Sequence, residues 1–332
     1  MPRRLLAAPV LWVWLLSPAA AMDAASINNA EYESAKPPVA SKVDALVIKL
    51  QVLLDRARFS PGEIDGKLGE NAQKALKAFA EARGLKPTQP LTPELWKALA
   101  GTSPDAVVTD YKISNDDIKG PFQERLPARM EDLRHLKAVG YTSPREAIAE
   151  KFHMSEGLLE ALNPKKNFSQ AGETILVANV LGNDAKLKAE RIEVDKSRQT
   201  VKVFTSSGEL VAFFPATVGS KEKPTPSGTL KVVSVDANPN YRYNPDYKFR
   251  GVKSKQAFEI KPGPNNPVGS YWIGLSAEGF GIHGTSSPST VSKTESHGCV
   301  RLTNWDAGLL GRNTRKGTPV TFVEAAPTGG KS

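Results

Sequence analysis

The sequence predicts a multidomain protein: a small all-α domain, a small α+β module and a mainly β, sandwich-like domain. The main observation is a change of hydrophobic period along the chain. Apolar residues recur at helical spacing before about residue 180 and alternate at a spacing of two after about residue 189. The chain has 332 residues, enough for two or three domains, and a hydrophobic content of 40% that supports real cores.

Residues 1–21 have the pattern of an export signal. Arg3-Arg4 gives a basic start, Leu5 to Leu16 is apolar apart from Pro9, and small residues follow at Ala19 to Ala21. A membrane anchor is the alternative, but the apolar run is shorter than the roughly 20 residues that span a bilayer. We therefore expect a signal peptide and an exported protein, with no stable membrane insertion after signal cleavage.

The charge and the cysteine content limit the partners and the chemistry. A formal net charge of +9 favours anionic surroundings, which for an exported protein are a cell wall or membrane surface and not nucleic acid. A merely soluble surface explains this charge equally well. The single cysteine, Cys299, excludes an intrachain disulfide and any cysteine-rich zinc site.

Residues 22–40 are small, polar and proline-containing, and we expect a disordered leader there. Residues 41–101 follow as a compact helical unit. Leucines from Leu46 to Leu54 lie on one face of a first helix, and a second apolar face ends at Phe79. Thr92 before Pro93 is an N-cap followed by proline at the first helical position, which starts a third helix.

This helical unit resembles the three-helix peptidoglycan-binding domain of cell-wall enzymes. The family pattern is carried by Leu50-Gln51, the Asp65-Gly66 turn, Gly69 and Phe79, although Ala80 stands where the family usually has glutamine. A generic helical bundle is the alternative. The resemblance implies that the unit holds the protein on peptidoglycan.

Residues 102–140 mix charges and prolines and predict a linker, with a possible strand near Val107 to Tyr111. Residues 141–180 predict two helices, which begin at Ser143-Pro144 and Met154-Ser155, and then a strand. With its "IAEKF" and "ALNP" segments, this region resembles a LysM sugar-binding module. A packing role without glycan binding is equally open. We expect both upstream units to bind the wall without taking part in the chemistry.

Residues 189–324 form the predicted β domain, a sandwich or a partly closed barrel, with 325–332 as a tail. This domain contains "GIHGTSSPSTVSKTESHGCVRL", which brings Cys299 near two histidines, His283 and His297. A thiol attacks only as thiolate, and an imidazole can take its proton. Gly298 lets the backbone turn sharply, so that N–H groups could bind an oxyanion.

Two other interpretations fit this stretch. A lone cysteine is commonly a buried, inert thiol. Two histidines and a cysteine could also bind zinc, and the spacing does not reject this. Local chemistry leaves these alternatives open.

The same stretch resembles the signature of the L,D-transpeptidase catalytic domain, the YkuD family. The signature positions are His283, then Ser296-His297-Gly298-Cys299 and Val300-Arg301. The resemblance implies that Cys299 is the nucleophile and His283 the proton acceptor and donor. Gly284 would orient His283 through its carbonyl. Supporting roles fall to Ser296 and Gly298 in the loop, to His297 near the oxyanion, and to Arg301 in the loop or toward a substrate carboxylate.

The resemblance also implies the reaction. A periplasmic, wall-associated enzyme would take a tetrapeptide stem of peptidoglycan, release its terminal D-alanine and pass the acyl group to an amine of a second stem. Its partners would be stem peptides and glycan strands, and no cofactor is implied. Alternative acceptors are water, a free D-amino acid or a protein. A non-enzymatic wall-binding protein and a zinc hydrolase are alternatives of other classes.

Overall fold

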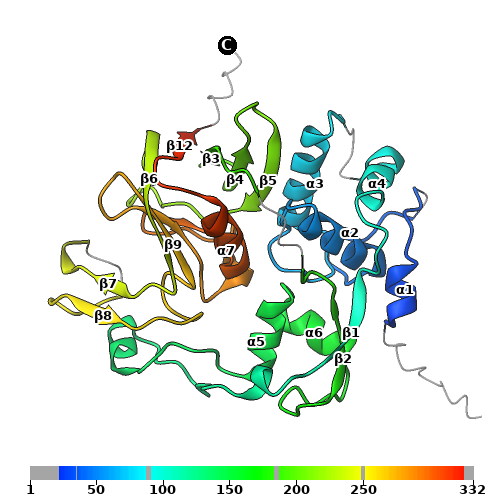
Figure 1. The fold of residues 1–332 in the computed structure, drawn as a ribbon, viewed down its shortest axis with the longest axis horizontal. Coiled ribbons are helices and arrows are strands. Elements are labelled where there is room, and N and C mark those ends of the chain that lie inside the picture. The colour runs from blue at the N-terminus through cyan, green and yellow to red at the C-terminus, as the bar shows by residue number, and fades with distance from the viewer. Residues whose placement is uncertain (1–21, 35, 87–90, 183–186, 248–250, 325–332) are drawn as a thin grey trace, which may run out of the picture.

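The computed structural model of the chain describes residues 22–34, 36–86, 91–182, 187–247 and 251–324. The predicted order holds: a helical part comes first and a large β domain follows (Figure 1). The expected export signal at 1–21 and the tail at 325–332 lie outside the described residues. Among the residues described, no helix has both the length and the apolar character needed to cross a membrane.

The first helical unit contains α2 (Ala45–Arg56), α3 (Glu70–Ala82) and α4 (Pro93–Ala100). Helix α2 begins where the Asp44 carboxylate accepts a hydrogen bond from the Leu46 N–H at 2.8 Å. The predicted cap of α4 is confirmed, because the Thr92 hydroxyl accepts from the Leu95 N–H.

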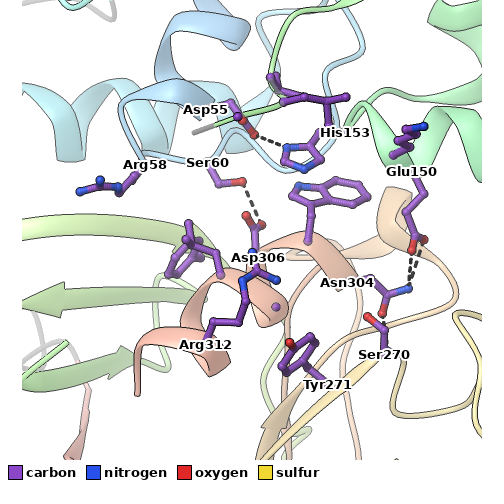
Figure 2. Close-up of a pocket in the computed structure, with 18 of the residues that line it drawn as sticks. Asp55, Arg58, Ser60, Glu150, His153, Ser270, Tyr271, Asn304, Asp306 and Arg312 are labelled. Atoms are coloured by element: carbon purple, nitrogen blue, oxygen red, sulfur yellow. Dashed lines mark hydrogen bonds and ion pairs between the residues drawn. The ribbon is translucent and has the colours of Figure 1, made fainter. Parts of the chain in front are cut away.

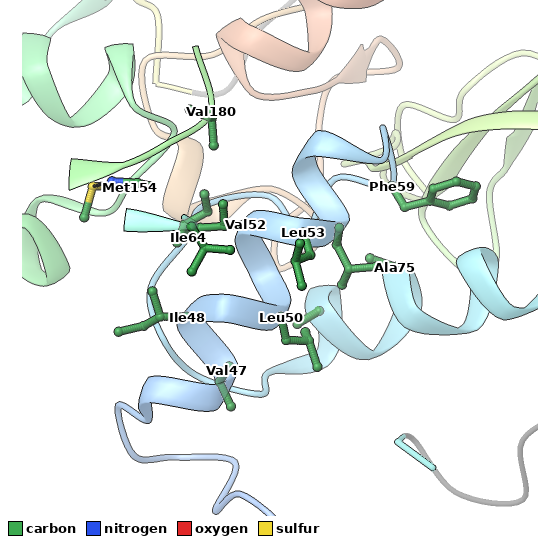
Figure 3. Close-up of a cluster of buried hydrophobic side chains, with 14 of the residues drawn as sticks. Val47, Ile48, Leu50, Val52, Leu53, Phe59, Ile64, Ala75, Met154 and Val180 are labelled. Atoms are coloured by element: carbon green, nitrogen blue, oxygen red, sulfur yellow. Dashed lines mark hydrogen bonds between the residues drawn. The ribbon is translucent and has the colours of Figure 1, made fainter. Parts of the chain in front are cut away.

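A buried glutamine holds the predicted turn of this unit. The Gln51 side-chain oxygen accepts from the Gly66 N–H at 2.7 Å, and its amide nitrogen donates to Asp65 at 2.9 Å. Figure 3 shows the apolar core around α2, in which Leu50 and Leu53 lie near Ala75 of α3.

The expectation of a disordered leader over residues 22–40 was wrong for its first part. Helix α1 (Ala24–Asn28) is ordered by long-range contacts that composition does not show. Ile27 is fully buried, and the Asn28 side-chain oxygen accepts from the N–H groups of Val107 and Val108. An apolar anchor and a paired amide thus fix a segment of low overall hydrophobicity.

The second unit has the order β1–α5–α6–β2. Strand β1 (Val108–Lys112) pairs antiparallel with β2 (Thr174–Ala178), and α5 (Pro144–Lys151) and α6 (Glu156–Leu162) lie between them in the chain. Strand β1 comes from the segment that we expected to be a linker. The likeness of this unit to LysM stays a prediction.

Between β1 and α5 the chain crosses to the β domain, along the lower edge of Figure 1. It contains the 3-10 helices η1 (Asp116–Ile118) and η2 (Met130–His135). We call residues 121–140 the bracing segment, because they pack on a hairpin of the β domain. Leu133 and Val139 form a small core with Ile260 of that hairpin, and the Val139 N–H donates to the Pro262 carbonyl at 3.0 Å.

The β domain has one eight-stranded sheet in the order β11-β10-β9-β6-β12-β3-β4-β5. Its two edges approach each other, because Thr217, just after β5, and Arg301 on β11 exchange backbone hydrogen bonds of 2.9 and 2.8 Å. Of the two expected forms, a sandwich or a partly closed barrel, the domain therefore has the second: it is a single curled sheet. The strands of this sheet are β3 (Arg191–Asp195), β4 (Thr200–Phe204), β5 (Leu210–Pro215), β6 (Gly228–Ala237), β9 (Tyr271–Leu275), β10 (Gly281–His283), β11 (Val300–Arg301) and β12 (Pro319–Val323).

A hairpin, two 3-10 helices and one α-helix complete the described part of the domain. Strands β7 (Tyr241–Tyr243) and β8 (Phe258–Ile260) form the hairpin that the bracing segment supports, and η3 (Pro245–Tyr247) follows β7. A short turn, η4 (Pro288–Thr290), precedes the Cys299 loop. Helix α7 (Asn304–Asn313) packs on the sheet, where its Ala307 and Leu310 join the core of the domain.

The helical part is joined to the β domain through buried contacts. The Ser60 hydroxyl donates to the Asp306 carboxylate of α7 at 2.9 Å. The Ser60 N–H donates to the Phe213 carbonyl of β5 at 2.9 Å. Phe213 belongs to the same hydrophobic core as helices α2 and α3, so the upstream units are packed against the β domain.

Candidate active site

The parallel pair of β10 and β11 positions the predicted site residues. Ile282 lies opposite Val300, and His283 lies opposite Arg301. Ile282 and Val300 are buried in the core of the domain. Because successive side chains of a strand point to opposite faces, His283 and Arg301 face away from that core. Together with Cys299 they line a cavity of about 830 Å³.

The loop before Cys299 depends on glycine and serine. Gly298 has φ +110°, and a Cβ built on it would lie 2.8 Å from a ring carbon of Phe280. The Ser296 hydroxyl donates to the Cys299 carbonyl at 2.5 Å and accepts from the Gly298 N–H at 3.2 Å. The Ser296 N–H donates to the Val218 carbonyl at 2.8 Å. Ser296 and Gly298 therefore fix the turn that presents the thiol.

The Cys299 thiol is protonated in the free protein. It donates a long hydrogen bond of 3.6 Å to the Gly279 carbonyl. Burial raises the pKa of this thiol to about 11, although the backbone of Gly281 and the charge of Arg301 act in the opposite direction. A thiol with this pKa needs a base that removes its proton as it reacts.

His283 has the properties of such a base. Its Nδ1 lies 2.6 Å from the Gly284 carbonyl oxygen. A carbonyl only accepts, so Nδ1 carries the hydrogen and Nε2 keeps its lone pair. Burial, and then the charge of Arg301, lowers the His283 pKa to about 3, so the ring is neutral at pH 7. The Trp272 ring stacks on it with centroids 5.7 Å apart.

His297 and Arg301 differ in their surroundings. His297 lines the cavity and is largely exposed, but partial desolvation, and then the charges of Arg301 and Lys223, lowers its pKa. Arg301 is partly buried, and its Nε has no hydrogen-bond partner among the described residues. Its positive charge can attract an anionic group that enters the cavity, and it lowers the pKa of the thiol.

Several walls of the cavity were missed by the sequence reasoning. Trp272 and Phe280 contribute rings, Tyr241 comes from the hairpin, and Met130 comes from the bracing segment. These residues have no motif of their own. Trp272 could have been inferred from its place on a strand next to the strand of His283. The bracing segment could not, because Met130 and His283 are separated by 153 positions in the sequence and no local pattern shows that they meet.

A zinc site at the two histidines and Cys299 was one alternative for this stretch. In the described part of the chain, no group of three or more His, Cys, Asp and Glu side chains is arranged to hold a metal ion.

Comparisons with known families assign the two main parts of the chain. Residues 189–322 match the family model YkuD, described as the L,D-transpeptidase catalytic domain. Residues 43–99 match the model described as "Putative peptidoglycan binding domain". The β domain is therefore a catalytic domain of the L,D-transpeptidase class. The chain carries a YkuD-family catalytic domain behind an N-terminal peptidoglycan-binding domain.

Curated relatives and solved structures carry related names. The chain is 29% identical over 180 residues to "Putative L,D-transpeptidase YkuD" of Bacillus licheniformis, which covers 54% of this chain and 92% of that protein. It is 27% identical over 191 residues to "Probable L,D-transpeptidase YbiS" of Escherichia coli, covering 56% and 61% of the two chains. L,D-transpeptidase 3 from Mycobacterium tuberculosis aligns over 48% of this chain and 78% of its own, at 18% identity and a TM-score of 0.34.

Proposed function

We propose that the protein is a peptidoglycan L,D-transpeptidase in which Cys299 is the nucleophile and His283 the general base and acid. The observation that carries the proposal is that a half-buried, neutral thiol and a buried, neutral imidazole line one cavity of a YkuD domain. Neither group is charged at rest, so the proton moves only when a substrate carbonyl is in place.

The first half-reaction forms a thioester. The Cys299 Sγ gives its proton to Nε2 of His283 and attacks the carbonyl that precedes the terminal D-alanine of a tetrapeptide stem. The N–H groups of the tight turn at Cys299 would stabilise the oxyanion of the tetrahedral intermediate. The C–N bond then breaks, and the imidazolium returns the proton to the departing D-alanine amine.

The second half-reaction transfers the acyl group. The amine of a second stem attacks the thioester and gives a proton to His283, and the thiolate leaves and takes that proton back. The product is an amide cross-link between two stems. Arg301 would attract a substrate carboxylate into the cavity, because its guanidinium Nε is buried without a partner in the described structure.

The rest of the chain fits work on a cell wall. We propose that the protein is exported to the periplasm through the signal at residues 1–21, and that residues 41–101 hold it on peptidoglycan. The LysM-like unit, with β1 as its first strand, would add a glycan contact. Cys299 has no need of a cofactor in this scheme.

Mass spectrometry of muropeptides after incubation with the purified protein tests the proposal. We expect linked stems and free D-alanine, and a thioester adduct on Cys299 in the intact protein. Cys299→Ala should remove both the adduct and the products while the fold is kept. Trimmed tripeptide stems would indicate water as acceptor, and exchanged stems a free D-amino acid. If the Cys299→Ala variant still forms cross-links, the proposal that Cys299 is the nucleophile is wrong.

A further inference from the structure

We propose that Glu150, on α5 of the second unit, is a positioning residue for His283 and acts through Asn304. This inference rests on the proposed role of His283. Glu150 belongs to the unit that resembles a wall-binding module. The position of the catalytic histidine would therefore depend on how that unit packs against the β domain. Figure 2 shows Glu150 and Asn304 facing each other across the junction of the domains, near Ser270.

The Asn304 amide is held at both ends. Its Nδ2 donates to both carboxylate oxygens of Glu150, at 3.0 and 3.1 Å, and to the Pro264 carbonyl at 3.0 Å. Its Oδ1 accepts from the Ser270 N–H at 3.0 Å. These four contacts determine which way the amide points, because an acceptor at Glu150 requires the nitrogen on that side.

The same amide supports the backbone beside the catalytic histidine. A Cβ built on Gly284 would lie 2.2 Å from Asn304 Oδ1, and one built on Gly269 would lie 2.0 Å from it. Both glycines therefore allow an approach that any side chain would prevent. The Gly284 N–H is bonded to the Tyr271 carbonyl at 3.2 Å, on the neighbouring strand.

Gly284 is the link to the reaction. Its carbonyl accepts the Nδ1 hydrogen of His283 at 2.6 Å and so selects the tautomer whose Nε2 is basic. A shift of Gly284 would move this carbonyl and release the ring. Glu150 is thus linked to His283 in three steps. It holds the Asn304 amide, this amide packs closely against Gly284, and the Gly284 carbonyl accepts the hydrogen bond from His283.

Glu150 is itself fixed on the side of the second unit. The Tyr141 hydroxyl donates to its carboxylate at 2.9 Å. Glu150, Asn304, Ser270 and Tyr141 line a cavity of about 380 Å³ at the junction of the three parts of the protein. Glu150 is half-buried, and the desolvation of its carboxylate raises its pKa to about 7. Taking a carboxylate out of water is costly, so it needs the hydrogen-bond partners that it has here.

The test compares three variants of the full chain at Glu150. Glu150→Ala removes the acceptor, and Glu150→Met removes it while filling the space. Glu150→Gln keeps one acceptor oxygen for Asn304. We expect the first two to lower kcat for stem-peptide turnover by about 10- to 100-fold, as a misplaced catalytic group does, with KM within about twofold. Glu150→Gln should restore most of the rate.

A readout independent of turnover separates this inference from the proposed function. In ¹⁵N spectra of His283, the wild type should show Nδ1 protonated, and Glu150→Met should show a mixture of tautomers. Glu156→Ala is the matched control, since Glu156 pairs with Arg145 within the same unit at 2.7 Å. Unchanged kcat and an unchanged His283 spectrum in a folded Glu150→Met would overturn the inference. If the wild-type protein does not turn over stem peptides but the His283 spectra are as expected, the proposed function is wrong and the inference on Glu150 stands.

Discussion

His283 and Arg301 lie directly opposite each other in the parallel pair of β10 and β11. Burial, and then the permanent positive charge of Arg301, lowers the His283 pKa to about 3. The same arginine favours the thiolate of Cys299, although burial raises the pKa of that thiol. One guanidinium therefore adds to the effect of burial on the proposed base and opposes it on the proposed nucleophile.

The first prediction follows from this arrangement. An ordinary histidine base, with a pKa near 6.5, would lose activity as the pH falls from 7 to 5. Since the pKa of His283 is lowered, kcat/KM should stay nearly constant in this range and fall only toward pH 3 to 4. Stopped assays on a soluble stem peptide measure the profile. A tenfold loss between pH 7 and pH 5 would show that another group is the base.

The second prediction separates the two histidines. Loss of a general base typically costs about 100- to 10,000-fold in rate, so His283→Ala should fall in that range or lower. His297 is exposed and is separated from Cys299 by Gly298, so His297→Ala should lower the rate less than His283→Ala does. Alkylation of Cys299 by iodoacetamide at pH 7 should slow in His283→Ala. If His297→Ala slows it and His283→Ala does not, the roles must be exchanged.

The third prediction concerns the turn before the nucleophile. Gly298→Ala adds a Cβ at φ +110° and 2.8 Å from Phe280, so we expect the loop to shift and activity to fall by about 100-fold. Gly208→Ala is a matched control, because Gly208 also has a positive φ of +85° but has open space around it. It should cost about 1 kcal/mol of stability and leave activity intact. Thermal melts and turnover measure both, and equal activities for the two variants would contradict the steric argument.

The sequence predicted the elements that are governed by local chemistry. The Thr92 and Ser143 caps and the Asp65-Gly66 turn form as expected, because caps and turns involve neighbouring residues. The curled sheet was expected only as a sandwich or a partly closed barrel. Its edges meet through Thr217 and Arg301, and no local pattern specifies such a pairing.

The site was predicted only in part for the same reason. His283 and Cys299 were found because a compact motif contains both. The contact between Asn304 and Glu150 was not predicted, because the two residues are 154 positions apart in the sequence. Helix α1 was missed because Asn28 finds its partners at Val107 and Val108, 79 and 80 positions away.

The fourth prediction concerns the pH dependence of stability at the junction of the domains. Burial raises the pKa of Asp306 to about 7. The folded state then binds a proton that the unfolded state has released, so this contribution to stability is present below pH 4 and is lost as the pH rises to about 7. His283 has the opposite sign, because its pKa is lowered. The difference between wild type and Asp306→Asn isolates the Asp306 contribution.

Urea unfolding at several pH values between 4 and 7.5 measures this difference. Asparagine at position 306 can still accept from Ser60, so the hydrogen bond survives while the ionisation is removed. We expect Asp306→Asn to gain stability relative to wild type as the pH rises. Asp116→Asn, which removes an exposed carboxylate on η1, is the control. A constant difference between Asp306→Asn and wild type across the range would contradict the prediction.

The last prediction concerns the bracing segment. We expected residues 102–140 to be a linker between two wall-binding units, yet Met130 of this segment lines the cavity that contains Cys299. Met130, like Phe258 and Tyr241 of the hairpin β7–β8, packs against the small core of Leu133, Val139 and Ile260. Loss of its apolar contact with a bound stem should weaken binding by about 1 kcal/mol, or roughly fivefold.

Met130→Ala should therefore raise KM about fivefold for a soluble stem peptide and leave kcat within about twofold, because the contact is with the substrate body and not with the reacting carbonyl. Arg129→Ala is the control, since Arg129 is exposed and pairs with Asp132 at 2.8 Å. Steady-state kinetics on both variants test whether Met130 contacts the bound stem. If KM is unchanged in Met130→Ala, the bracing segment supports the hairpin and makes no contact with the bound stem.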